Sequence, residues 1–184
     1  MPAVEMVETP TIQNSKEAFE IAQEHFGQVP NLVKALATNG DMCLSVTAFF
    51  AQALQDGRVP WAFKELVILK TLRSIGAYYS YGAHERIASE LGNSAERIGD
   101  LSNSLWEASP HFTEGEKTVF KLVDQIAVDA NDVGDDIWVP LKEHYDAGQL
   151  VELNALITTF VMIGRVGDSL GVSEPYLFAG TVSA

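Results

Sequence analysis

Side chains in one short stretch of the chain, residues 65–88, have the types that proton-transfer chemistry needs. Glu65 opens the apolar segment ELVILKTLRSIG, and Ser80 and His84 follow the break at Gly76. Ser80 and His84 are four residues apart, so on a helix the hydroxyl and the imidazole can meet directly or through one water. Glu65 could fold back over them if the two helices pack antiparallel. This set can carry general acid–base chemistry. The alternative is a hydrogen-bonded core histidine, with Glu65 capping the helix or forming a local salt bridge.

The segment after Gly76 is predicted to continue as a second helix up to Gly92, which makes the bend a helix–turn–helix. At helical spacing, one face of this second helix collects Ala77, Ser80, Tyr81, His84 and Ala88. Arg73 precedes the bend in a strongly apolar helix, where a buried guanidinium needs a partner. It could meet Glu65 or a substrate carboxylate, and a structural or subunit-interface ion pair is the alternative.

Other chemistries have little support in the sequence. Ser80 is not in a G-x-S-x-G nucleophile elbow, so acyl transfer is not expected. No pair of histidines or acids has a metal-ligand spacing such as H-x-x-x-H, and no glycine-rich phosphate loop is present. Cys43 is the only cysteine and lies in an apolar helical run, so we interpret it as a small buried hydrophobic residue in a reducing compartment.

Composition limits the partners that this protein can have. The 184 residues are 47% hydrophobic and 20% charged, which is ordinary for one soluble globular domain. A net charge of −13 argues against binding to nucleic acid or to an anionic membrane surface. No secretory signal is visible at the N-terminus, and the longest apolar run, residues 154–164, is too short to span a bilayer. These features predict a cytoplasmic protein.

The elements that must position the candidate site are helices almost throughout. Gly, Asn and Asp turns separate segments of helical periodicity, and no strand-like alternation persists, so the fold is predicted to be all-α with about eight helices. Asn14 and Ser15 are expected to cap the first helix, which should stop at Gly27. Thr113 and Glu116 have the spacing of a capping box. Segments 61–75 and 150–170 are apolar nearly all round, as core or subunit-interface helices are.

The same stretch resembles the carboxymuconolactone decarboxylase/AhpD-like superfamily of all-α proteins. KELVILKTLRSIGAYYSYGAHERIASELG matches the decarboxylase-like branch, in which the pattern often reads RELVIL…YEW…H, and FGQVPNLVKALA and the segment from FTEGEKT onward resemble the flanking helices. The resemblance covers roughly residues 19–172. It implies a domain at 19–172 between an N-terminal extension, 1–18, and a C-terminal tail, 173–184. It also implies a homo-oligomer, a trimer or a hexamer, with the active pocket near the subunit interface.

The departures from the family pattern decide which chemistry is expected. Peroxidases of the AhpD type carry C-x-x-C, and those two positions fall here on Ala77 and Ser80, so a thiol-dependent alkyl hydroperoxidase is not expected. Ser80 also stands where the decarboxylase branch often has its glutamate, which puts literal carboxymuconolactone decarboxylation in doubt.

The hypothesis that remains is a cofactor-independent, metal-free acid–base enzyme of decarboxylase, lyase, isomerase or cyclase type, acting on a small oxygenated molecule. A non-catalytic ligand-binding or structural oligomer is the alternative. In the enzyme hypothesis, His84 is the acid and base, Glu65 orients it, and Ser80 and Tyr79 donate hydrogen bonds. Tyr81 and Arg73 are the predicted substrate-binding residues.

Overall fold

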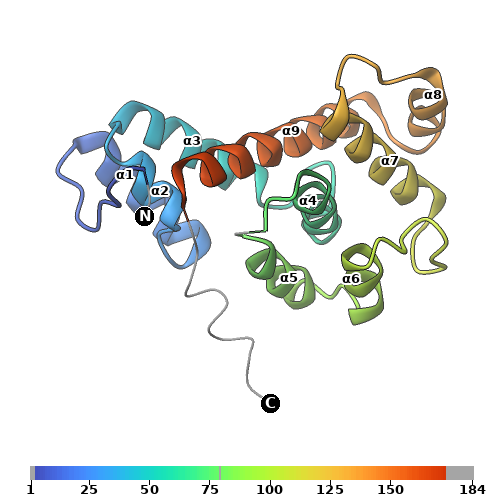
Figure 1. The fold of residues 1–184 in the computed structure, drawn as a ribbon, viewed down its shortest axis with the longest axis horizontal. Helices are drawn as coiled ribbons and strands as arrows, with labels where there is room; N and C mark the ends of the chain where they lie inside the picture. The colour runs from blue at the N-terminus through green and yellow to red at the C-terminus, as the bar shows by residue number, and fades with distance from the viewer. Residues whose placement is uncertain (1–2, 79, 173–184) are drawn as a thin grey trace. The chain divides into compact units, whose positions relative to one another are not determined.

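The structure is a computed structural model that describes residues 3–78 and 80–172. These residues form nine helices and no strand (Figure 1). The predicted all-α class is confirmed, and nine helices are close to the expected number of about eight. The shortest, α2, has only six residues. In chain order the helices are α1 (Gln13–Phe26), α2 (Asn31–Leu36), α3 (Gly40–Ala53), α4 (Trp61–Ile75), α5 (Tyr81–Glu90), α6 (Ala95–Ser102), α7 (Glu114–Val128), α8 (Asp135–His144) and α9 (Ala147–Leu170).

The chain divides into two compact units. One consists of the described residues of Met1–Gln55 and Val166–Ala184, and the other is Asp56–Arg165. Helix α9 contributes residues to both, because the division falls between Arg165 and Val166. The candidate residues Glu65, Ser80 and His84 all belong to the second unit. The predicted domain limits at 18/19 and 172/173 stay a prediction.

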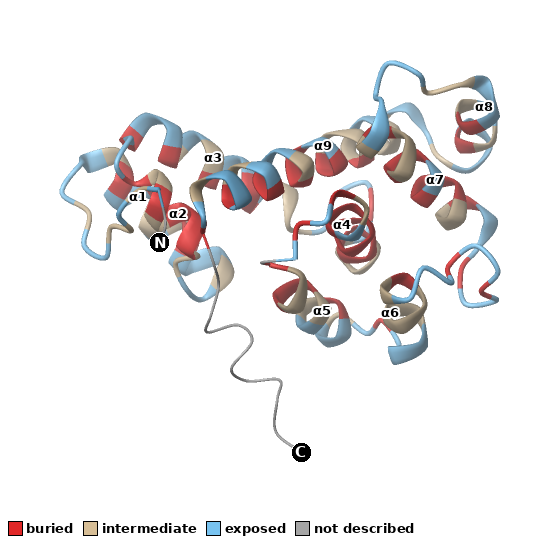
Figure 2. Ribbon diagram, viewed as in Figure 1, coloured by how far each residue is buried: buried red, intermediate tan, exposed pale blue. Residues whose placement is uncertain are grey.

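Helix α4 is the centre of the second unit. Its residues from Lys64 to Leu72 are all buried, and it packs against α5, α6 and α7. Figure 2 shows buried positions nearly all round α4. The sequence prediction of a helix that is apolar on all sides is therefore confirmed for this element, and such a helix requires neighbours around its circumference.

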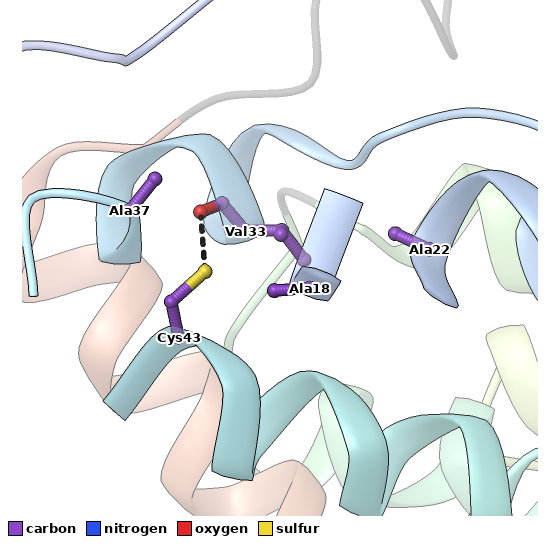
Figure 3. Packing of buried hydrophobic residues seen from close by; sticks show 5 residues of the cluster. All are labelled: Ala18, Ala22, Val33, Ala37 and Cys43. Carbon is purple, nitrogen blue, oxygen red and sulfur yellow. Dashed lines mark hydrogen bonds between the residues drawn. The ribbon is translucent and has the colours of Figure 1, made fainter. Parts of the chain in front are cut away.

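The first unit is built on the packing of α1 against α3. Small side chains fill its core and allow the helices to approach closely, as Figure 3 shows for Ala18, Ala22, Val33, Ala37 and Cys43. Helix α1 stops at Gly27, as predicted, where the backbone turns into the left-handed region at φ 69°.

The expected side-chain cap at the start of α1 is wrong. Ile12 occupies the N-cap position and makes no capping bond. Ser15 instead donates to the Ala37 carbonyl at 2.8 Å, and Asn14 donates to Asp41 at 2.7 Å. Both polar side chains serve contacts with segments more than twenty residues away, which local periodicity does not reveal.

Two helices of the second unit begin with side-chain caps, and the capping box predicted at Thr113 and Glu116 is confirmed. Ser94 accepts a hydrogen bond from the Arg97 backbone amide at the start of α6. At the start of α7, Thr113 and Glu116 form the reciprocal capping box, with the Glu116 carboxylate accepting from the Thr113 amide at 2.9 Å.

Helix α9 is longer than the apolar run that the sequence singles out. Within the described residues, it is the one helix long and apolar enough to cross a membrane by length and composition. Leu153, Ile157 and Phe160 nevertheless lie buried in the second unit, and a core helix of a globular protein passes the same length test.

Candidate functional site

The bend between α4 and α5 is set by a helix-terminating motif at Gly76. Gly76 has φ 72°, its amide bonds the Arg73 carbonyl, and the Ala77 amide bonds the Leu72 carbonyl at 3.0 Å. This is the paired hydrogen-bond pattern of a Schellman motif, in which glycine takes the left-handed conformation at no steric cost. The predicted break at Gly76 is thereby confirmed.

Helix α5 begins later than the sequence predicted. It starts at Tyr81, with Ser80 as its N-cap residue at φ −106° and ψ 0°, and Ala77 lies in the connection before it. The predicted helical face is therefore wrong at Ala77 and correct only from the start of α5 onward. The Schellman motif is the reason, because it uses the residues after Gly76 to reverse the chain.

Glu65 and His84 form a buried hydrogen-bonded pair. His84 Nδ1 lies 2.7 Å from Glu65 Oε2, and the exposed fractions of His84 and Glu65 are 8% and 0%. Trp61 donates its indole Nε1–H to the other carboxylate oxygen, Glu65 Oε1, at 2.7 Å. Each oxygen of the buried carboxyl group thus has a hydrogen-bond partner, as buried polar groups require.

The second ring nitrogen of His84, Nε2, has surroundings that differ from those of Nδ1. Across residues 3–78 and 80–172, Nε2 has no hydrogen-bond partner, and the His84 side chain keeps 10% of its surface accessible. The edge contact with the Phe160 ring, at a centroid distance of 5.0 Å and an interplanar angle of 87°, fixes the imidazole from α9. A carboxylate on Nδ1 and an unengaged Nε2 are the arrangement that a histidine base uses.

Ser80 adds a polar atom without a bonding partner. Its residue is 9% exposed, and no group in the described part of the chain bonds the buried Oγ. The direct Ser80–His84 hydrogen bond that the spacing allowed is therefore not formed. Most buried hydroxyls have a partner, so one that lacks it is available to a bound molecule or a water.

Tyr81 and Arg73, the predicted substrate-binding residues, lie in other contacts. The Tyr81 hydroxyl is 2.9 Å from Ser102 Oγ on α6, and burial raises the pKa of Tyr81. Arg73 is exposed and donates from Nη1 to the Tyr78 hydroxyl at 3.0 Å, so the expectation of a buried guanidinium that meets Glu65 is wrong. Arg73 is in the last turn of α4, where the side chain reaches solvent and a cation suits the helix end. Tyr79 lies outside the described residues.

A second buried charged group in this unit was not predicted. Lys70 is 5% exposed and bonds both the Asp124 carboxylate and Ser74 Oγ. Burial lowers the pKa of Lys70, and the bond to Asp124 acts in the opposite direction. Trp106 lies beside the ammonium, at 5.3 Å from nitrogen to ring centroid. In the part of the chain that the structure describes, no group of three or more His, Cys, Asp or Glu side chains lies together as a metal site would need.

The sequence of this chain is similar to that of known proteins. Residues 42–125, which contain Glu65, Ser80 and His84, match the family model described as the Carboxymuconolactone decarboxylase family. This match supports the resemblance of the chain to the carboxymuconolactone decarboxylase/AhpD-like superfamily. A curated relative, the uncharacterized protein YdfG of Bacillus subtilis (strain 168), is 24% identical over 109 residues, which are 59% of this chain and 73% of that protein.

Solved structures of other proteins share the fold of this chain over most of their length. The debrominase Bmp8 in its apo form has a TM-score of 0.78 and 14% identity, covering 91% of this chain and 89% of that one. An alkylhydroperoxidase AhpD core, an uncharacterized peroxidase-related protein from Ralstonia eutropha JMP134, has a TM-score of 0.76 and 15% identity, covering 98% and 99%. At these identities the likeness establishes the fold alone.

Cys43 lacks the exposure and the low pKa of a reactive thiol. Cys43 is fully buried in the core of the first unit, where its Sγ lies 3.5 Å from the Val33 carbonyl oxygen (Figure 3). Burial raises the pKa of the Cys43 thiol, which disfavours the reactive thiolate. The sequence interpretation of Cys43 as a buried hydrophobic residue is confirmed.

Proposed function

We propose that this protein is a cofactor-independent acid–base enzyme of decarboxylase, lyase, isomerase or cyclase type, acting on a small oxygenated organic molecule. The observation that carries the proposal is the buried Glu65–His84 hydrogen bond of 2.7 Å. The similarity to these proteins supports enzymatic activity, because the name of the matching family and the structural neighbours include a decarboxylase, a debrominase and peroxidase-related proteins.

In the proposed mechanism Glu65 accepts the Nδ1 proton of His84 in a hydrogen bond and thereby leaves a lone pair on Nε2. Nε2 removes a proton from the substrate, and the imidazolium that forms is stabilised by the adjacent carboxylate. His84 then returns the proton to the intermediate. Glu65 keeps this role through the cycle, because it is fully buried and both of its oxygens already have hydrogen-bond partners.

Ser80 is proposed to donate a hydrogen bond to the oxygen on which negative charge develops. Its buried Oγ lacks a partner among the described residues, and it stands one helical turn before His84. Preorganised donors at such a position lower the barrier because they need no reorganisation during the reaction. Tyr79 is proposed as a second donor, and Tyr81 and Arg73 as substrate contacts. A homo-oligomer, trimer or hexamer, in the cytoplasm remains part of the proposal.

The test is proton exchange with solvent. The purified protein is incubated in D2O with enolisable oxo acids and lactones, including 4-carboxymuconolactone, and 1H NMR follows deuterium uptake and product formation. We expect His84→Gln, which still offers Glu65 a donor, to lower the rate on the active compound by about 10²–10⁴-fold. His84→Ala should have the same effect.

His111→Ala is the matched control, because His111 is exposed and outside the site. Its rate should equal that of the wild type, and circular dichroism should give the same helix content for every variant. Unchanged turnover in both His84 variants would refute the assignment. Absence of exchange with every compound would favour the non-catalytic alternative.

A further inference from the structure

We propose that Trp61 is a positioning residue that holds Glu65 in the orientation in which His84 keeps its proton on Nδ1. The inference rests on the proposed function and extends it to a residue outside the predicted set of catalytic and substrate-binding residues. Trp61 is one helical turn before Glu65 on α4, and its indole nitrogen lies 2.7 Å from Glu65 Oε1. The only sequence signal was this i, i+4 spacing of an N–H donor and a carboxylate.

The two oxygens of Glu65 have different partners. Oε2 faces His84 Nδ1 and Oε1 faces the Trp61 indole, so the carboxylate plane is fixed by two donors from different helices. The last torsion of a glutamate is otherwise soft, and a carboxylate held at one oxygen only can rotate. Because Glu65 is 0% exposed, bulk water does not replace the indole N–H when it is removed.

Trp61 is itself fixed at the start of its helix. The Asp56 carboxylate accepts the Trp61 backbone amide at 2.8 Å, and Pro60 precedes it as the N-cap residue. The amide of the first helical residue has no partner within the helix, so the Asp56 contact satisfies a donor that would otherwise be free. A chain of hydrogen bonds thus runs from Asp56 through Trp61 and Glu65 to His84.

Trp61→Phe tests the inference, because it removes the N–H and keeps an aromatic ring. The readout is the tautomer of the neutral His84 imidazole, observed by 15N-edited NMR of histidine-labelled protein. In the wild type we expect the Nδ1–H form to dominate. In Trp61→Phe we expect a mixture of both tautomers, since the carboxylate is no longer fixed. Trp138→Phe, the same change at another half-buried tryptophan, should leave the tautomer unchanged.

A double-mutant cycle, measured by kcat, distinguishes the positioning of Glu65 by Trp61 from a general packing effect of the indole ring. Trp61 acts through Glu65, so Trp61→Phe should lower kcat about tenfold and leave KM unchanged. In the Glu65→Gln background the same substitution should have no effect on kcat. An unchanged His84 tautomer in Trp61→Phe would overturn the inference, as would an equal loss of kcat in both backgrounds. Because the NMR measurement needs no substrate, it tests the role of Trp61 even if the proposed enzymatic function fails.

Discussion

Gly164 on α9 is where a single methyl group should reveal how tightly the bend is packed. A Cβ at this position would lie 2.7 Å from the Ala77 Cβ and 2.7 Å from Ile75 Cδ1. The Ile75 methyl is the end of a flexible side chain and can move, but the Ala77 Cβ is fixed to the backbone of the bend. We therefore predict that Gly164→Ala destabilises the protein, although alanine is the better helix former.

The magnitude follows from comparison with Gly99 on α6. A Cβ on Gly99 would have nothing within 4 Å, so Gly99→Ala should gain the helix-propensity difference of about 1 kcal/mol. Gly164→Ala gains the same amount and loses about 1–3 kcal/mol to overpacking. The two variants should thus differ by about 2 kcal/mol. For a chain of 184 residues, that difference corresponds to about 4–8 °C in Tm.

Urea unfolding followed by circular dichroism, together with thermal scans, measures this difference. Gly164→Ala should lie below the wild type and Gly99→Ala above it. Ala77→Gly removes the fixed methyl, so the double variant Ala77→Gly/Gly164→Ala should show less than the sum of the two single losses. If Gly164→Ala is as stabilising as Gly99→Ala, the close approach of α9 to the bend is refuted.

Two further predictions concern buried ionisable groups. The Lys70 side chain is 6% exposed and the Asp124 side chain 48%, so only the carboxylate can be rehydrated when its partner is removed. Asp124→Asn should therefore cost about 1–3 kcal/mol of unfolding free energy, and Lys70→Met less than about 1 kcal/mol. Equal losses of the two variants in urea titrations would contradict this prediction. Burial, and next the Glu116 carboxylate, raises the pKa of Tyr145 to about 12. The folded state therefore resists ionisation, and the stability that Tyr145 contributes is complete below pH ~10 and is lost as pH rises toward ~12. Tyr145→Phe should accordingly lose less stability than the wild type between pH ~10 and ~12, and a parallel decline of both proteins would contradict the raised pKa of Tyr145.

The sequence predicted the helices well where local chemistry fixes their ends. Gly27 and Gly76 were correctly identified as stop signals because glycine takes a left-handed backbone at no steric cost. The Thr113–Glu116 capping box was also correct, because both of its hydrogen bonds are local. The start of α1 and the start of α5 were wrong, since Ser15 bonds a distant carbonyl and the Schellman motif delays α5 to Tyr81.

The candidate site was only partly accessible from the sequence. Residue types and spacing singled out Glu65 and His84, and the structure brings them within hydrogen-bond distance. The same reasoning predicted that Arg73 is buried, but the residue is exposed. The reason is that a helix that is apolar on all sides along most of its length can still have a final turn that reaches solvent. Trp61 was missed as a donor because nothing in the sequence tells which way an indole points.

By itself, the sequence determined the helical class and singled out the side chains whose chemistry could serve proton transfer. Those properties depend on periodicity, on turn residues and on which side chains are present, and all of these are local. The tertiary structure decided which of those groups meet: the 2.7 Å contact of Glu65 with His84 joins residues nineteen positions apart on two helices. It also decided that Ser80 stays unengaged among the described residues. The physical reason is that hydrogen-bond partners across helices are fixed by packing and rotamer choice, which short-range sequence patterns do not encode.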